Sequence, residues 1–201
     1  MKSVTAAEAG ALAAWRTIAQ QDRIGALVFN DARIEEIRPH RSKANAMRIL
    51  GAVVEQNRVL TVASGIEPNP LMLNIALQRA ARLAKHDFLV CLITDGSGNN
   101  SETGDLLTQI AQHNDVLVVF VFDPLESELP DAGPLVFSDG SRQLEVDTGQ
   151  RRLREEFRDA FAEVRAKSRR FLLQRETPVI PLKTAEDVAE QIRRHLGTAR
   201  R

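Results

Sequence analysis

Two nearly continuous apolar runs, Phe88-Leu89-Val90-Cys91-Leu92-Ile93 and Val116-Leu117-Val118-Val119-Phe120-Val121-Phe122, decide the fold class of this chain. Apolar runs of this length without alternation are typical of strands that are covered on both faces of a parallel sheet. Between them, apolar residues recur at helical spacing over Leu106–Ala111. The order strand, helix, strand predicts two parallel strands joined by a crossover helix, and therefore an α/β protein.

The part of the chain before these runs predicts helices and a hairpin. The spacing Thr5-Ala6-Ala7-Glu8 matches a capping box, so a helix is expected to open almost at residue 1 and to end near Gln21. Turn residues then predict an antiparallel hairpin with strands over 24–29 and 33–38, the second of which ends at Pro39. Apolar periodicity predicts two further helices, one from residue 44 and one over 73–83.

The part of the chain after these runs changes character. A loop from Asp123 to Asp131 leads into a small peripheral hairpin with its turn at Asp139-Gly140. A long helix from about Arg151 to Gln174 carries an apolar face that we expect to pack on the sheet. The hairpin strands are expected over 135–137 and 143–146. A short edge strand, where prolines are tolerated, follows over 178–181, and a closing helix over 185–196.

Together these elements predict one domain over residues 1–201, a three-layer α/β fold with a Rossmann-like open sheet. A doubly wound sheet normally begins with a central strand, and here no strand precedes the first helix. We therefore expect the first central strand to be missing and the domain to be truncated at its N-terminal side. A non-functional fragment with an open sheet is one hypothesis that this leaves.

Charge and cysteine content exclude several classes of function. The chain carries 27 basic and 27 acidic side chains, but residues 1–150 have a net charge of −6 and residues 151–201 a net charge of +6. No Lys or Arg lies between Lys85 and Arg142, so an anionic ligand would be repelled there and no nucleic acid is expected. Cys91 is the single cysteine, and no apolar run is long enough for a signal peptide or a membrane span, which predicts a cytoplasmic protein.

Several stretches resemble a bacterial family known as domain of unknown function 58. They are Asp22–Phe29, Arg38–Arg41, Ile93–Asp95, Val121–Gly133 and Leu144–Asp147, of which Asp123-Pro-Leu-Glu-Ser-Glu-Leu-Pro is the most specific. The resemblance covers nearly the whole chain and implies a von Willebrand factor A-like domain. Members are typically encoded beside MoxR-type AAA+ ATPases, so the resemblance implies an adaptor or chaperone-like scaffold that binds such an ATPase and is not an enzyme.

The resemblance also bears on a metal site. The Asp-x-Ser-x-Ser motif of von Willebrand factor A domains is absent, but Asp95 matches by order the aspartate that such domains contribute from a later loop. Asp95, Ser97 and Asn99 alternate in a glycine-bearing loop, so their oxygens are candidate ligands for Mg²⁺ or Ca²⁺. The competing interpretation, which we favour, is a strand-to-helix turn at Asp95-Gly96 that caps the next helix.

Catalytic residues are not evident. His40, His86, His113 and His195 fall into no ligand or triad spacing, and Cys91 is expected to be inert inside a buried strand. No cofactor is expected other than the possible Mg²⁺ or Ca²⁺. The alternative function is a metal-dependent α/β hydrolase or phosphotransferase with its site around Asp95.

The acidic loop is the candidate partner-binding surface. Asp123, Glu126, Glu128 and Asp131 alternate with Leu125 and Leu129, which combines charge with apolar anchors. One hypothesis is that this loop docks a basic surface of the ATPase. The other is that it pairs within the fold with arginines of the long helix: Arg151, Arg152 and Arg154.

Overall fold

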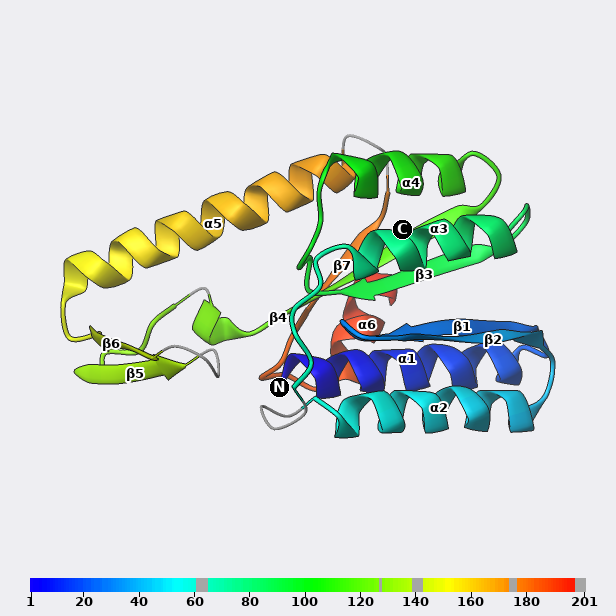
Figure 1. Ribbon diagram of the computed structural model, residues 1–201, viewed down its shortest axis with the longest axis horizontal. Coiled ribbons are helices and arrows are strands. Elements are labelled where there is room, and N and C mark those ends of the chain that lie inside the picture. The colour runs from blue at the N-terminus through cyan, green and yellow to red at the C-terminus, as the bar shows by residue number, and fades with distance from the viewer. Residues whose placement is uncertain (61–64, 127, 139–142, 174–176, 198–201) are drawn as a thin grey trace.

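The computed structural model describes residues 1–60, 65–126, 128–138, 143–173 and 177–197, with the side chains of the long helix described up to residue 163. Figure 1 shows the arrangement of its elements. In chain order they are α1 (Lys2–Ala19), β1 (Ile24–Phe29), β2 (Ile34–His40), α2 (Lys43–Arg58), α3 (Met72–Leu83), β3 (Leu89–Thr94), α4 (Ser101–Ala111), β4 (Asp115–Phe122), η2 (Pro124–Glu126), β5 (Pro134–Ser138), β6 (Gln143–Asp147), α5 (Arg151–Leu173), β7 (Val179–Lys183) and α6 (Val188–Gly197).

A parallel sheet of three strands, ordered β3-β4-β7, forms the centre of the molecule. On one of its faces α3 and α4 pack against Val116 and Val118. On the other face α1 and α6 pack against Val119 and Val121. Burying a side chain of this size contributes about 1.5–3 kcal/mol of transfer free energy, so these two clusters are the main source of stability. The predicted three-layer α/β architecture with a parallel open sheet is confirmed.

The antiparallel hairpin of β1 and β2 is also confirmed, and Ile37 packs with Ile49 of α2. The prediction that Pro39 ends the second strand is wrong, because β2 runs on to His40. A proline is tolerated there because β2 lies at the edge of its sheet. The pairing is irregular beside it, and a side chain at Gly25 would lie 2.8 Å from the backbone nitrogen of Pro39. Gly25 therefore makes this close approach possible.

The strand β3 is less covered than its apolar sequence predicts. Leu89 is 66% exposed, and Cys91 is exposed as well. The prediction of a strand buried on both faces is therefore wrong at this edge, and β3 pairs only with β4 among the described strands. The Cys91 sulfur is still enclosed enough for burial to raise the pKa of the thiol to about 11.

One predicted helix cap and one predicted helix start differ from the structure. Helix α1 begins at Lys2, so Thr5 lies inside it, where its hydroxyl donates to the Met1 carbonyl oxygen at 3.3 Å and the predicted capping box does not form. Helix α6 begins at Val188, three residues later than predicted. The reason is local, because the Asp187 carboxylate accepts a hydrogen bond from the backbone N–H of Glu190 at 2.8 Å and so caps the helix there.

The peripheral hairpin forms as predicted, since β5 and β6 pair antiparallel from Pro134↔Asp147 to Ser138↔Gln143. Its predicted turn at Asp139-Gly140 lies outside the described residues. The hairpin and the first half of α5 stand apart from the rest of the molecule in Figure 1. The prediction that α5 packs its apolar face on the sheet is wrong for this half, because Phe157 is exposed and, among the described residues, the helix contacts the sheet mainly at β7. We call β5, β6 and residues 151–163 the arm.

The predicted edge strand near the C-terminal end is confirmed as β7. It pairs in parallel with β4 from Val118↔Val179 to Phe122↔Lys183, and it buries Ile180 and Leu182. No helix in the described part of the chain is both long enough and apolar enough to cross a membrane.

Candidate functional site

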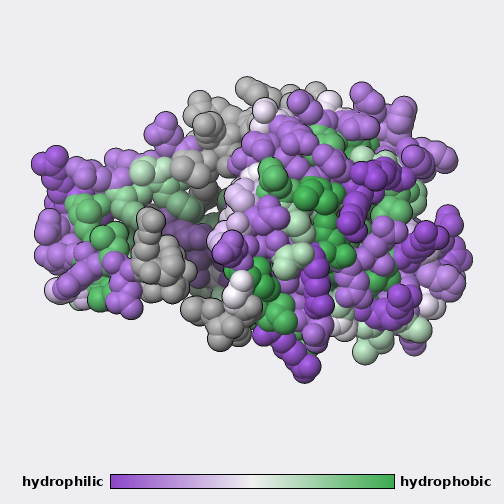
Figure 2. Space-filling model, viewed as in Figure 1, coloured by the Kyte–Doolittle hydropathy of each residue, from purple (hydrophilic) through white to green (hydrophobic). Residues whose placement is uncertain are grey.

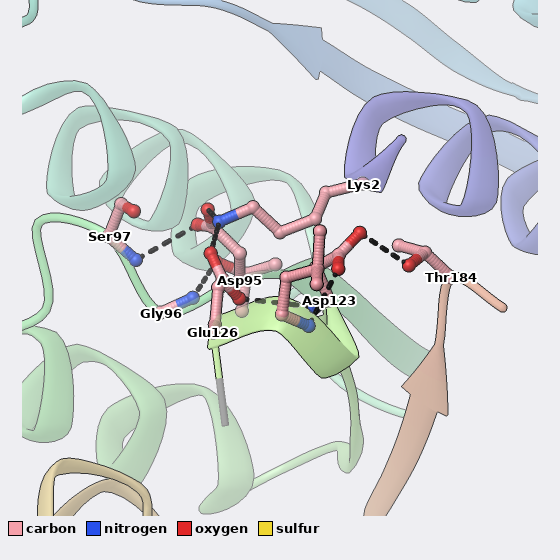
Figure 3. A network of polar contacts seen from close by, with 9 residues as sticks. Lys2, Asp95, Gly96, Ser97, Asp123, Glu126 and Thr184 are labelled. Atoms are coloured by element: carbon pink, nitrogen blue, oxygen red, sulfur yellow. Dashed lines mark hydrogen bonds and ion pairs between the residues drawn. The ribbon is translucent and has the colours of Figure 1, made fainter. Parts of the chain in front are cut away.

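Loops from three parallel strands meet at the carboxyl edge of the central sheet, as Figure 3 shows. Asp95 follows β3, Asp123 follows β4 and Thr184 follows β7, while Lys2 lies in the first turn of α1. Open α/β sheets place their binding sites at this edge because the loops of neighbouring strands converge there. It is also where the sequence predicted two groups of site residues, around Asp95 and in the acidic loop.

Asp95 is fixed by hydrogen bonds to both of its carboxylate oxygens. The Lys2 ammonium donates to Oδ2 at 2.8 Å, and the backbone N–H of Ser97 donates to Oδ1 at 3.0 Å. Burial by itself would raise the pKa of Asp95, but the hydrogen bonds from Lys2 and Ser97 together outweigh it and lower the pKa. Asp95 is therefore held as a carboxylate, and each of its oxygens accepts a hydrogen bond.

Lys2 joins Asp95 to the loop after β4. Its Nζ atom lies 2.6 Å from Oε1 of Glu126, so one ammonium group bridges two carboxylates that come from different strands. Burial opposes the charge of Lys2, but the two ion pairs prevail and raise its pKa above 10.5. This bridge attaches the start of α1 to the carboxyl edge of the sheet.

The bridge decides how well this loop fits a metal ion. Mg²⁺ and Ca²⁺ require about six or more oxygen ligands, and Asp95 with Ser97 supplies few of them. The position between the Asp95 and Glu126 carboxylates is taken by the Lys2 ammonium. Among the described residues, no three His, Cys, Asp or Glu side chains are grouped so that they could hold a metal ion. The donor set of Asp95 and Ser97 therefore does not fit a divalent cation as it is folded.

The loop of Asp95 is a turn, as the competing interpretation held, but it does not cap the next helix. The cap of α4 is Asn100, whose side chain accepts from the backbone N–H of Thr103 at 3.1 Å while the Thr103 hydroxyl accepts from the Asn100 N–H at 3.0 Å. Gly98 has a φ of +77°, and a Cβ there would lie 2.5 Å from the Pro70 carbonyl oxygen. Only glycine fits this close approach to the segment before α3.

Asp123 closes the other side of the edge. Its Oδ2 accepts from the Thr184 hydroxyl at 2.7 Å, and its Oδ1 accepts from the backbone N–H of Leu125 at 2.9 Å. These two hydrogen bonds lower the pKa of Asp123, so it is ionised and holds the loop after β4 to the loop after β7. Glu126 also accepts from the Asp123 N–H, at 3.1 Å.

The four acidic residues predicted to bind a partner thus have different surroundings. Asp123 and Glu126 are engaged at the sheet edge, as described above. Asp131 pairs with Arg154 of α5 at 3.1 Å, whereas Glu128 is exposed. The intramolecular hypothesis is therefore confirmed for Arg154. It is wrong for Arg151 and Arg152, which pair within the helix with Glu155 and Glu156: each distance is 2.8 Å.

Arg154 also fixes the root of the arm. Its Nη1 donates to the Thr148 carbonyl oxygen at 2.6 Å, and Thr148 is fully buried and donates to the Gly133 carbonyl oxygen at 2.8 Å. One guanidinium group therefore ties the first turn of α5 to both ends of the hairpin.

The sequence did not indicate a site role for Lys2 or Thr184, nor the contact between Arg154 and Thr148. Lys2 lies 93 positions from Asp95 and 124 from Glu126, so no local spacing connects them. The available signal was topological: a helix that starts at the carboxyl edge of a sheet brings its first residues to the loops of that edge.

Comparison with known proteins places the chain in a family. The family model described as "Protein of unknown function DUF58" matches residues 1–167. This chain belongs to DUF58. The resemblance seen in the sequence is therefore confirmed. No solved structure matches this DUF58 chain.

The curated relatives are themselves uncharacterized. The chain is 26% identical over 184 residues to "Uncharacterized protein Rv1480" of Mycobacterium tuberculosis (strain ATCC 25618 / H37Rv), a match that covers 90% of this chain and 55% of that protein. It is 33% identical over 99 residues to "Uncharacterized protein MAV169" of Mycobacterium avium, covering 47% of this chain and 57% of that protein. This DUF58 chain thus spans about half the length of these relatives.

Proposed function

We propose that this DUF58 chain is a non-enzymatic protein-interaction module, an adaptor or chaperone-like scaffold that works with a MoxR-type AAA+ ATPase in the cytoplasm. The von Willebrand factor A-like character and the ATPase partner rest on the family resemblance. The observation that carries the interaction role is the apolar surface that the arm exposes. The carboxyl edge of the sheet supports the same role indirectly, since its carboxylates hold the fold together.

The arm has one apolar face. In the register of the hairpin, Phe137 lies opposite Leu144 and Leu135 lies opposite Val146, and opposed residues of an antiparallel pair point to the same side. All four are apolar, and none of them is buried: Leu144 is 64% exposed, and Phe137 is 41% exposed. A hairpin of two strands is only marginally stable without a cover on its apolar face. An uncovered face of this kind marks a surface for another protein.

The position of the arm suits docking. Figure 2 shows hydrophobic residues at the surface of the arm, and a hollow between the arm and the rest of the molecule. Phe157 of α5 adds a further exposed aromatic side chain, and Leu125 of the acidic loop that leads into the arm is 58% exposed. Apolar anchors with a polar rim are the pattern from which protein interfaces obtain most of their affinity.

The loop that leads into the arm is acidic. From Asp123 to Asp131 it contains acidic side chains and no basic ones, and Glu128 is exposed on it. A complementary surface would be basic with apolar pockets, because opposite charges steer association and like charges disfavour it. We therefore propose that a basic, partly apolar surface of the ATPase contacts this acidic loop and the apolar face of the arm.

The test is binding of a purified MoxR-type ATPase by the chain and by matched variants. Replacing both Phe137 and Leu144 by serine (F137S/L144S) is expected to weaken binding by a factor of about 30 or more, as for residues at the centre of an interface. The matched control is Met47→Ser, which removes an apolar side chain that is 56% exposed on α2, away from the arm. Equal binding by the wild type and F137S/L144S, or an equal loss in the control, would contradict the proposal.

A further inference from the structure

The first two helices meet at the end of the molecule that lies opposite the acidic loop. α1 begins at the carboxyl edge, where Lys2 contacts Asp95, and Trp15 lies about 20 Å further along the helix axis. α2 begins at that far end, because the Asn45 side chain in its first turn donates to the Ile24 carbonyl oxygen at the start of β1, at 2.7 Å. The two helices therefore run antiparallel and pack side by side, as Figure 1 shows.

This end of the helix pair exposes apolar side chains. Leu12 and Trp15 lie three residues apart on one face of α1, and they are 39% and 40% exposed. On α2, Met47 is 56% exposed. Gly51 lies one turn further along the same face, and a Cβ there would meet nothing within 4 Å. Two neighbouring helices thus turn large apolar side chains toward solvent.

Basic side chains accompany these apolar ones. The segments 15–23 and 38–48 meet at this end and carry six basic side chains against one acidic side chain, Asp22. All six are exposed, and even Arg38, whose Nε atom lies 3.8 Å from the Glu36 carboxylate, is 87% exposed. We call Trp15, Met47 and the six basic residues the basic end, and the six are Arg16, Arg23, Arg38, Arg41, Lys43 and Arg48.

The carboxylates of the acidic loop are too distant to oppose this charge. Glu126 lies beside Lys2, so it is separated from Trp15 by most of the length of α1. That distance is about 20 Å, whereas dissolved ions at physiological strength screen charges over about 8 Å. An anionic surface that contacts the basic end therefore experiences mainly the basic side chains, although residues 1–150 have a net charge of −6.

We propose that the basic end docks on the surface of an anionic lipid bilayer, with Trp15 and Met47 inserted among the lipids and the basic side chains against the headgroup phosphates. A tryptophan ring prefers the boundary between headgroups and acyl chains. Amphipathic surfaces bind there through apolar burial together with attraction to anionic lipid, and each Lys or Arg near the bilayer adds to the affinity. This docking goes beyond the adaptor role, and its surface is separate from the arm.

Lipid fits the basic end better than nucleic acid does. The phosphate backbone of a nucleic acid is bound by Lys and Arg side chains, and it offers nothing to the exposed aliphatic side chains of Leu12 and Met47. In a bilayer the same side chains leave water for the boundary of the acyl chains. Apolar burial and charge therefore act together only on lipid.

Trp15 is the single tryptophan of the chain, so its fluorescence reports on the basic end alone. The probe is a suspension of vesicles that contain phosphatidylglycerol and phosphatidylcholine in about equal amounts. We expect the emission to shift to shorter wavelength as the ring leaves water, and brominated acyl chains to quench it. Vesicles of phosphatidylcholine alone should leave the emission unchanged. No shift on the anionic vesicles, or the same shift on both kinds, would overturn the proposal.

A pair of matched variants tests the basic side chains. Arg41→Gln combined with Lys43→Gln removes two exposed charges from the basic end, and we expect vesicle binding to weaken about 30-fold. Arg151→Gln combined with Arg152→Gln removes two exposed charges from α5 and should bind as the wild type does. Thermal unfolding checks that both variants fold. Equal binding by the two variants would overturn the proposal.

Two further measurements separate lipid from other anionic or apolar partners. A duplex DNA oligonucleotide, added at the same phosphate concentration as the lipid, is expected to leave the chain on the vesicles. Displacement by the DNA would overturn the proposal in favour of nucleic acid. Without vesicles, we expect the emission to be independent of protein concentration. A shift that grows with protein concentration would overturn the proposal in favour of a second copy of the chain.

Discussion

At the scale of single residues, Lys2 holds the carboxyl edge of the sheet together. Its ammonium group lies 2.8 Å from Asp95 and 2.6 Å from Glu126, which are the ends of two separate loops. All three side chains are about one-third exposed, so solvent screens these ion pairs. The contribution of Lys2 to stability is therefore expected to be modest, and its larger effect is on where α1 lies.

The first prediction concerns the variant Lys2→Met. Removal of the ammonium leaves two carboxylates facing each other without a counter-charge, so we expect the free energy of unfolding at pH 7 to fall by about 1 kcal/mol. Urea denaturation measures this change. Lys85→Met removes an exposed lysine from the other end of β3 and should change stability by less than about 0.5 kcal/mol. Equal free energies of unfolding for K2M and the wild type would show that the bridge does not contribute to stability.

The pH dependence of this difference has a definite sign. The pKa of Asp95 is lowered below 3.8 in the folded chain, so its stabilisation is present above the unfolded pKa and is lost as the pH falls through the folded one. The pKa of Lys2 is raised above 10.5, so its stabilisation is present below that value and is lost as the pH rises through the folded one. The stability gap between wild type and K2M should therefore be largest between these limits. Unfolding curves from pH 3 to pH 11, about the limits set by these groups, would reveal a gap that stays constant if this assignment is wrong.

A pair of glycines gives opposite predictions. Gly98→Ala places a Cβ 2.5 Å from the Pro70 carbonyl oxygen at a φ of +77°, so we expect a loss of about 2 kcal/mol or more. Gly51→Ala lies in helix α2, where nothing is within 4 Å of the added atom, and should gain up to about 1 kcal/mol. Thermal unfolding distinguishes the two. A neutral Gly98→Ala would show that the loop moves freely away from α3.

Residue-scale prediction from the sequence succeeded where the signal was local. The apolar strand ending in Asp95-Gly96 predicted both the turn and its position at the carboxyl edge. Thr5 and Glu8 had the spacing of a capping box, but the helix begins earlier, at Lys2, and takes Thr5 into its interior. Lys2 itself was not predicted, because its partners are set by how α1 crosses the sheet and not by any neighbour in the sequence.

At the scale of elements, the arm depends on the contact between α5 and the hairpin. Arg154 pairs with Asp131 and donates to the Thr148 carbonyl oxygen, so it joins the loop before β5, the turn after β6 and the first turn of α5. The apolar residues of the described part of α5 are exposed or only half-buried, and they give this helix little other anchorage. Among the described side chains of α5, Arg154 is therefore the one that ties the helix to the root of the hairpin.

The variant Arg154→Met tests this dependence. We expect limited proteolysis in the segment from residue 128 to residue 150 to become severalfold faster, because local opening of the root costs less free energy. Arg152→Met is the matched control, since Arg152 pairs only within its own helix, with Glu156, and is mostly exposed. If both variants are cleaved at the wild-type rate, the root of the arm is held by contacts other than Arg154.

Element prediction failed for a physical reason at β3 and α5. Both sequences have strong apolar patterns. Such a pattern indicates only that burying this face against another element would be favourable. Whether a cover exists depends on tertiary structure: among the described strands β3 has a neighbour on one edge alone, and the first half of α5 extends from the body together with the hairpin. The strands and helices of the central sheet were predicted well because each has its own apolar pattern, even where its partner is distant in the sequence, as for Val118 and Val179.

At the scale of the whole molecule, an α/β body carries an arm that lacks a complete cover. The arm exposes the apolar face of a hairpin. The charge is divided along the chain, with an acidic part over residues 1–150 and a basic one over residues 151–201, and the arm takes residues from both. Proteins that assemble with others commonly leave such surfaces uncovered until the partner is present.

The central claim is that the arm binds another protein. Hydrogen exchange of the chain with and without a purified MoxR-type ATPase tests it most directly, because it locates the contact within the chain. The account predicts slower exchange in β5, β6 and residues 151–163, with α3 and α4 unchanged. Unchanged exchange throughout the arm in the presence of bound ATPase, with slower exchange in α3 or α4, would contradict it.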